Sequence, residues 1–177
     1  HIIQTISCLA QIERGELVED LPLSSSILKG GVNRRVLYVA LLLHDIGKAR
    51  IPLDILHKPG ALDPEEQVVM RGHPVIGYKM LVKQGGLRPE VLAAVRSHHE
   101  YLDGSGYPDG LKDAEIGDIV RMITICDIYA ALIERRSYKP PMAPDQAYGM
   151  LVLMGTKLDA ALVRAFEAVV LKTSQAA

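Results

Sequence analysis

The chain has 177 residues, of which 49% are hydrophobic and 23% are charged, and this composition excludes a disordered protein. The net charge of −1 excludes a broad basic surface of the kind that binds a nucleic acid polymer or an anionic membrane. No apolar run approaches the roughly 18 residues that a membrane span needs, so the sequence predicts one cytoplasmic domain over residues 1–177. Because the chain begins with His1 and not with methionine, we expect it to be part of a longer protein.

Helical periodicity begins with the first residues of the chain. Apolar residues spaced three or four positions apart predict a helix over residues 2–12, and a connecting stretch rich in serine and glycine follows. Residues 33–46 predict a strongly apolar helix that ends at Gly47. We therefore divide the domain into N-terminal helices, residues 1–48, and a remainder over residues 49–177.

Helix starts in the rest of the chain share one signal. Asp63 offers an N-cap, and Pro64 follows at the first helical position. The same use of proline predicts three more helix starts, at Pro74, Pro89 and Pro144. Long apolar helices are predicted over residues 119–134 and 159–171, and strand signals are nearly absent. The sequence therefore predicts an all-α fold, an orthogonal helical bundle.

A histidine and an aspartate, His44 and Asp45, stand together at the end of the most apolar predicted helix. A carboxylate in apolar surroundings costs several kcal/mol unless a partner compensates it, and a divalent cation is a suitable partner. The alternative is an ordinary hydrogen-bonded pair at a helix end. A second aspartate, Asp127, lies in the apolar string "RMITICDIYAAL", where the alternative to a metal ligand is a buried ion pair with Arg121 or Arg135.

Three further histidines complete an oxygen-and-nitrogen ligand set of the kind that two-metal hydrolases use. His73 precedes a proline at a predicted helix start, where the alternative role is a helix cap. His98 and His99 are adjacent, so both can face one site only near a helix end. Glu100 is expected either to orient an imidazole or to be solvated. His57 falls outside this set and is expected in a solvated loop.

These motifs resemble the HD-GYP branch of the HD-domain metal-dependent phosphohydrolases. The resemblance runs from about residue 41 to residue 170 and rests on the HD pair with Lys48, the HP pair, and the strings "HHEYLDGSGYPDG" and "CDIYAAL". It implies an all-α core that holds a metal centre. The implied metal ligands are His44, Asp45 as a bridge, His73, His98, His99 and Asp127.

The same resemblance implies hydrolysis of cyclic di-GMP, a bacterial second messenger, to linear pGpG or onward to GMP. Asp45 and Lys48 are the expected catalytic residues, because Asp45 would be shared by two cations that activate water and Lys48 would contact the phosphate. Arg136 and Lys139 are expected to hold the phosphates and guanines, and Tyr107 to line a guanine pocket. The resemblance also implies a sensor or receiver domain in the full-length protein.

Three departures from the family pattern bear on the site. The family has a further histidine on its opening helix, and His1 stands at that position, which implies a seventh metal ligand. The upstream glutamate that accompanies a third metal in some members would precede His1, so we predict two divalent transition-metal ions, iron or manganese. The family commonly has an aspartate where this chain has Ala130, on the substrate side of the site.

Residues 1–48 also resemble the HD domain of the bacterial uridylyltransferase/uridylyl-removing enzyme, whose domain likewise leads with a histidine at the position of His1. Both relatives hydrolyse phosphodiesters, so two enzyme activities stay open. One is cleavage of cyclic di-GMP, and the other is removal of uridylyl groups from a nucleotidylated regulatory protein. A non-catalytic module that binds a cyclic dinucleotide is the third possibility.

Overall fold

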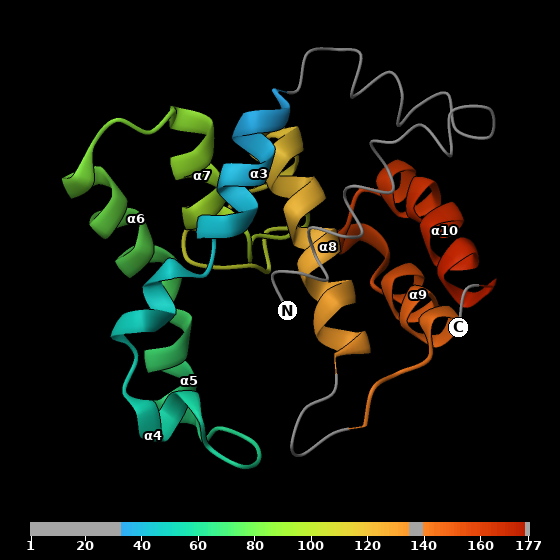
Figure 1. The fold of residues 1–177 in the computed structure, drawn as a ribbon, viewed down its shortest axis with the longest axis horizontal. Helices are drawn as coiled ribbons and strands as arrows, with labels where there is room; N and C mark the ends of the chain where they lie inside the picture. Colours follow the sequence, from blue (N-terminus) through green and yellow to red (C-terminus); the bar gives the residue numbers. More distant parts are fainter. Residues whose placement is uncertain (1–32, 135–139, 176–177) are drawn as a thin grey trace. The chain divides into compact units, whose positions relative to one another are not determined.

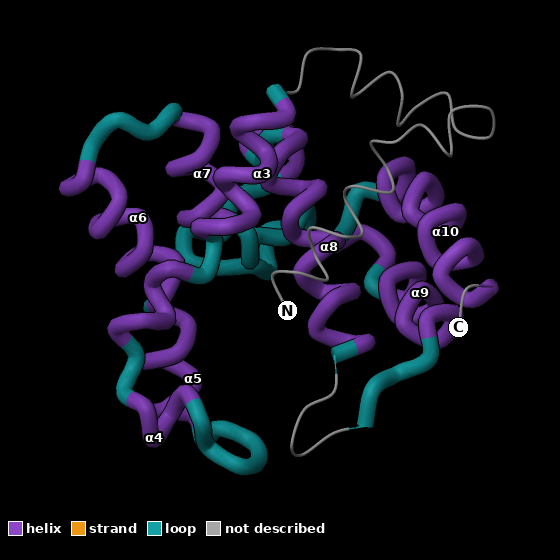
Figure 2. The backbone as a smooth tube through the Cα atoms, viewed as in Figure 1, coloured by secondary structure: helices purple, strands orange, loops and turns teal. Residues whose placement is uncertain are grey.

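The computed structural model describes residues 33–134 and 140–175. Within these residues the chain forms helices joined by loops and no strand, so the predicted all-α class is confirmed (Figures 1 and 2). The elements are α3 (Arg34–Leu43), η1 (Ile46–Arg50), α4 (Leu53–Leu56), α5 (Pro64–Arg71), α6 (His73–Gln84), α7 (Pro89–Ser97), η2 (Asp113–Glu115), α8 (Asp118–Ile133), α9 (Pro144–Leu153), η3 (Gly155–Lys157) and α10 (Ala160–Gln175).

The predicted proline signals mark real helix starts. Asp63 caps α5 with a capping box, in which its carboxylate accepts from the backbone N–H of Glu66 at 2.9 Å and the Glu66 carboxylate accepts from the N–H of Asp63. Proline likewise stands in the first two positions of α6, α7 and α9. These signals need only local sequence, which explains why the helix starts were predictable.

One boundary was predicted wrongly. The helix expected over residues 33–46 ends at Leu43, and the chain continues through a turn into the 3-10 helix η1. The cause is tertiary, because the backbone of η1 lies directly against the start of α6. A Cβ atom on Gly47 would overlap the carbonyl oxygen of His73 and lie 2.7 Å from the backbone nitrogen of Gly77. Only glycine allows this approach, which brings the HD pair up to His73.

The chain packs as two compact units. The first, called here the histidine unit, is Arg34–Val120. In it α6 packs on η1 and on α7, and α3 packs on α7. Its interior is formed by side chains with at most 8% exposure from these helices, including Leu37, Leu41, Leu81, Val91 and Val95. Burial of this apolar surface is the main term that holds the three helix ends near His44, His73 and His98 together.

The second, called here the C-terminal unit, comprises the described part of residues 121–175. In it α9 packs on α10, and the ring of Tyr129 on α8 meets the ring of Phe166 on α10 edge-on, with centroids 4.8 Å apart. Cys126 on α8 is buried. Within the described residues no helix is both long and apolar enough to cross a bilayer. The prediction of a single domain over 1–177 stays a prediction.

Candidate metal centre

Three histidines of the histidine unit stand directly after helix ends and use the same orienting contact. His44 follows α3, His73 follows the C-cap of α5, and His98 is the C-cap of α7. In each, the ring Nδ1 lies within hydrogen-bond distance of the carbonyl oxygen three residues earlier; these carbonyls belong to Leu41, Met70 and Val95, at 2.7, 2.8 and 3.0 Å respectively. A carbonyl only accepts, so each Nδ1 carries the proton and each neutral ring keeps its lone pair on Nε2. This is the tautomer that binds metal through Nε2.

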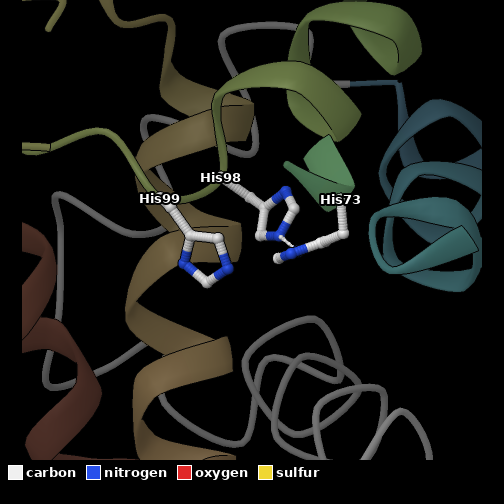
Figure 3. Close-up of side chains that lie close together, drawn as sticks. All are labelled: His73, His98 and His99. Carbon is white, nitrogen blue, oxygen red and sulfur yellow. Dashed lines mark hydrogen bonds between the residues drawn. The ribbon is translucent and has the colours of Figure 1, made fainter. Parts of the chain in front are cut away.

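Two of these nitrogens and one carboxylate oxygen converge on a single point. The Nε2 atoms of His73 and His98 are 3.2 Å apart (Figure 3). The Oδ1 atom of Asp45 lies 3.3 Å from the first and 3.8 Å from the second. Three atoms at these separations have a common centre about 2 Å from each, the circumradius of their triangle, which is the usual length of a bond from nitrogen or oxygen to a transition metal. Lone pairs so close repel one another, and a shared cation removes that repulsion. The residues fit a metal ion.

His44 and His99 extend this group. The Nε2 atom of His44 lies 3.7 Å from the Oδ2 atom of Asp45, so His44 faces the carboxylate oxygen other than the one that faces His73 and His98. His99 is half-buried, and one ligand nitrogen from each of His73, His98 and His99 lies within 4.8 Å of the others (Figure 3). The site therefore offers nitrogen ligands on both sides of one carboxylate.

Asp45 stays ionised in this setting. Burial works to raise the pKa of its carboxyl, but the positive charge of Lys48 and the hydrogen bond that it donates oppose burial, and the pKa lies below its ordinary value. The Nζ atom of Lys48 donates to Oδ2 of Asp45 at 2.7 Å while the lysine side chain remains 34% exposed. The cluster thus contains a negative charge with a partly exposed positive charge beside it.

Glu100 has a role that neither sequence expectation described. It is 1% exposed, so the solvated alternative is wrong. Its carboxylate accepts from the backbone N–H groups of Asp109, Gly110 and Leu111, at 2.6, 3.1 and 3.1 Å, so the prediction that it orients an imidazole is also wrong. Three backbone donors on one buried carboxylate satisfy its charge. Glu100 therefore anchors the loop over residues 101–112, the loop that contains the GYP sequence.

Further contacts fix the path of that loop. The backbone of Gly106 passes so close to residues 99–101 that a Cβ atom would lie 2.5 Å from the Cα atom of Glu100. Arg96 forms a two-pronged hydrogen bond to Asp109, with both separations 2.7 Å. As a result the ring of Tyr107 stacks on the ring of His99, with centroids 4.8 Å apart and planes 25° apart. The loop is tied directly to the histidine cluster.

The structure brings together the six predicted residues of the histidine unit, which are His44, Asp45, Lys48, His73, His98 and His99, with Tyr107 stacked against the last. Asp127 lies in the C-terminal unit, on α8, with 8% exposure, and its role as a ligand stays a prediction. Arg121, one of its suggested partners, donates to Asp159 at 3.0 Å. His57 is exposed, as expected. His1, Arg136 and Lys139 lie outside the described residues.

Sequence reasoning missed one residue at this site. Arg71, the last residue of α5, places its guanidinium carbon 5.1 Å from the centre of the Tyr107 ring. No sequence signal pointed to it, because a lone basic residue at a helix C-terminus ordinarily just complements the helix dipole.

A cluster of histidines and one carboxylate that fits a metal ion, held at helix ends, defines an all-α domain with a candidate metal centre, and comparison with known proteins agrees. The profile of the HD domain family matches residues 17–162, so this chain belongs to the HD domain family. HD-domain phosphohydrolases bind divalent metals, and this chain contains a histidine cluster, His73, His98 and His99, that could hold one.

Individual relatives extend the comparison. A probable cyclic di-GMP phosphodiesterase of Vibrio cholerae is 40% identical over 137 residues, which are 73% of this chain and 31% of that protein. A bifunctional uridylyltransferase/uridylyl-removing enzyme of Ruegeria pomeroyi is 82% identical over 50 residues, 28% of this chain and 6% of that protein. A solved HDG"Y"P protein of Bdellovibrio bacteriovorus shares the fold over 96% of this chain and 51% of its own, with 16% identity and a TM-score of 0.70. The chain thus spans about a third of the Vibrio relative's length.

Proposed function

We propose that this chain is a metal-dependent phosphodiesterase that hydrolyses cyclic di-GMP to linear pGpG in bacterial second-messenger signalling. The observation that carries the proposal is the convergence of two Nε2 lone pairs and the Asp45 carboxylate at distances that suit one metal ion. The 40% identity to a Vibrio cholerae protein of that name supports the choice of substrate. The sensor or receiver domain expected in the full-length protein remains part of this proposal.

Two ions are proposed because the two oxygens of Asp45 face different ligands. Oδ1 lies near His73 and His98, while Oδ2 lies near His44. A carboxylate placed in this way would hold two cations, one at each oxygen. Imidazole and carboxylate ligands without thiolate suit iron or manganese. The proposed ligand set is His1, His44, Asp45, His73, His98, His99 and Asp127.

In the proposed hydrolysis, different residues of the chain would have different roles. Bound divalent cations supply Lewis acidity and lower the pKa of a coordinated water to near neutrality. The carbonyl-held imidazoles keep the ligand atoms aimed at one place before substrate arrives, so no reorganisation is needed during the reaction. Lys48, whose side chain is 34% exposed beside Asp45, would contact a phosphoryl oxygen, where its charge offsets the negative charge that builds up. Arg136, Lys139 and Tyr107 are the proposed contacts to the rest of the substrate.

A second activity is favoured by one observation. The 82% identity over 50 residues to the Ruegeria pomeroyi enzyme supports removal of uridylyl groups from a nucleotidylated regulatory protein. That reaction also cleaves a phosphodiester, so it needs the same cluster and differs only in the substrate that reaches it. The long match to the Vibrio relative covers more of the chain, which is why cyclic di-GMP is proposed first.

One experiment separates these activities. The 177-residue chain is purified without oxygen, its metal content is measured, and it is incubated with cyclic di-GMP or with a uridylylated regulatory protein. We expect iron or manganese in the chain and pGpG from the first substrate, with both lost after chelation. Turnover of only the uridylylated protein would replace the substrate, and metal binding with neither turnover would indicate a non-catalytic module.

A matched pair of variants tests whether the cluster holds the metal. His98→Ala removes one converging nitrogen, whereas His57→Ala removes an exposed imidazole on the far end of α4. We expect His98→Ala to lose most of the metal and His57→Ala to keep it. Equal metal content in the two variants would contradict the assignment of His98.

A further inference from the structure

Arg71 carries an exposed positive charge at the edge of the histidine cluster. It is the last residue of α5, directly after Met70, whose carbonyl orients the ring of His73. Its guanidinium lies over the ring of Tyr107, 5.1 Å from the ring centre, and that ring in turn stacks on His99 at 4.8 Å. The two separations place the guanidinium carbon no farther than about 10 Å from the centre of the His99 ring.

Two independent anchors hold this charge in place. The backbone anchor is the turn over residues 70–73, which joins Arg71 to the ring of His73. The side-chain anchor is the stack of Arg71 on Tyr107, and the loop that carries Tyr107 is held by the buried carboxylate of Glu100. The centroids of the His73 and His99 rings lie 5.1 Å apart, so the residues at the two anchors also contact each other. A side chain fixed at both ends gives up little conformational entropy when it binds a ligand.

The guanidinium of Arg71 also differs from those of two neighbouring arginines in having no carboxylate. Arg88 pairs with Glu90 at 2.8 Å, and Arg96 pairs with Asp109 at 2.7 Å. For Arg71, no carboxylate lies within ion-pair distance among residues 33–134 and 140–175. Stacking on a ring uses the face of a guanidinium and leaves its N–H edge available. That edge forms paired hydrogen bonds to phosphate.

We propose that Arg71 binds the second phosphate of a cyclic dinucleotide, the one that is not being cut. This inference rests on the proposed function, because a cyclic dinucleotide carries two phosphodiester groups. The converging ligands and Lys48 serve the phosphate that reacts, so the other anion needs a cation some distance from them. Arg71 supplies it, already oriented by Tyr107. Tyr107 accordingly acts here as a support for Arg71 and His99.

The test compares Arg71→Gln with Arg88→Gln in the full 177-residue chain loaded with manganese. Arg88 is an exposed arginine at the opposite end of α7 from His98, and so is a control for the same substitution. We expect Arg71→Gln to raise the KM for cyclic di-GMP about 10- to 100-fold, the usual worth of a hydrogen-bonded charge pair, with manganese content unchanged. Arg88→Gln should match the wild type. Arg71→Lys, which keeps the charge without the fork, should fall between them.

A second ligand separates phosphate binding from guanine binding. The linear dinucleoside GpG has both guanines but a single phosphodiester, so its inhibition constant should be the same for wild type and Arg71→Gln. An increase as large as that for cyclic di-GMP would mean that Arg71 reads a guanine edge, and would overturn the proposal. An unchanged KM, or loss of manganese from Arg71→Gln, would overturn it too. If the wild-type chain leaves cyclic di-GMP intact, the proposed function itself fails, and the Arg71 proposal fails with it.

Discussion

The histidine cluster and the loop over residues 101–112 use hydrogen bonds in opposite directions. In the cluster, backbone carbonyls at three helix ends accept from ring nitrogens and so orient the side chains of His44, His73 and His98. In the loop, the side chain of Glu100 accepts from three backbone N–H groups and so orients the main chain. The contacts in the cluster orient the candidate metal ligands, and the contacts in the loop fix the backbone beside them.

Substitutions in the two regions should therefore have different effects on metal binding and on stability. The cluster depends on several rings around one carboxylate, so a single change there should abolish metal binding while the fold survives. The loop depends on one buried carboxylate, so a change there should cost stability while the metal ligands remain. Measurements of metal content and of the free energy of unfolding distinguish these two outcomes.

The largest effect is expected for Asp45→Ala, which removes the carboxylate that lies beside the Nε2 atoms of His73 and His98. Manganese affinity should fall more than about 100-fold, because even the outer partners of metal ligands are worth about 10–100-fold. Turnover should fall by more than about 1,000-fold, since the metal supplies several kcal/mol of transition-state stabilisation. Metal analysis and a turnover assay measure both. Asp54→Ala, at an exposed carboxylate on α4, is the control and should retain metal and rate.

The next effect is expected for Glu100→Gln, which should destabilise the loop and spare the cluster. The amide keeps the shape but loses the charge that three N–H groups share, so the free energy of unfolding should fall by about 2–3 kcal/mol. Urea unfolding measures this, and manganese content should stay at the wild-type level. Glu90→Gln removes an exposed carboxylate paired with Arg88 and should leave the free energy of unfolding near the wild-type value, because solvent screens an exposed ion pair. Equal losses in the two variants would contradict the anchoring role of Glu100.

These two regions also differ in how far the sequence could predict them. The cluster was predictable because histidine beside aspartate is rare in apolar surroundings and because proline and glycine signals place His44, His73 and His98 near helix ends. The helix starts at Asp63 and Pro89 were predictable for the same local reason. The function of Glu100 was not, since its partners are backbone groups that lie nine to eleven residues away and any residue type can supply them.

Tertiary contacts account for the remaining errors. The helix predicted over residues 33–46 ends at Leu43 because Gly47 meets the backbone of α6, and no local pattern shows which helix will approach. Arg71 was missed because its place over Tyr107 depends on a loop 30 residues farther along the chain, and Glu100 holds that loop. Residues recruited through a long-range contact carry no local signal.

A smaller effect is expected for Lys48→Ala, which tests whether the cluster holds metal without help from its neighbouring cation. Manganese content should be unchanged, because Asp45 and the imidazoles remain. Turnover should fall about 10- to 100-fold, somewhat less than for a fully buried charge-stabilising donor, since Lys48 is 34% exposed. Lys79→Ala, at an exposed position on α6, is the control. Loss of metal from Lys48→Ala, with an unchanged rate per bound ion, would show that Lys48 supports the ligands and not the reaction.

The smallest effect is expected at Asp159, a carboxylate that accepts from backbone N–H groups as Glu100 does but is less buried. Comparing the two separates the contribution of the hydrogen bonds from that of burial. Asp159 uses the same device at the start of α10, where one carboxylate oxygen accepts from the N–H groups of Ala161 and Leu162 at 3.0 and 3.1 Å, but its side chain is 23% exposed. Burial works to raise the pKa of Asp159, and the N–H of Leu162 together with Arg121 outweighs it, so the net pKa is lowered.

A carboxyl with a lowered pKa in the folded state stabilises the fold above its ordinary pKa of 3.8, and this stabilisation is lost as the pH falls through the lower, folded-state value. Asp159→Asn should therefore cost about 1 kcal/mol or less near pH 7, because asparagine also caps helices but cannot pair with Arg121. The gap between the unfolding free energies of the variant and the wild type should close as the pH falls below 3.8. Urea unfolding at several pH values measures it. A gap that widened in acid would mean that Asp159 is stabilised in its protonated form, and that the partly exposed carboxylate does not work as Glu100 does.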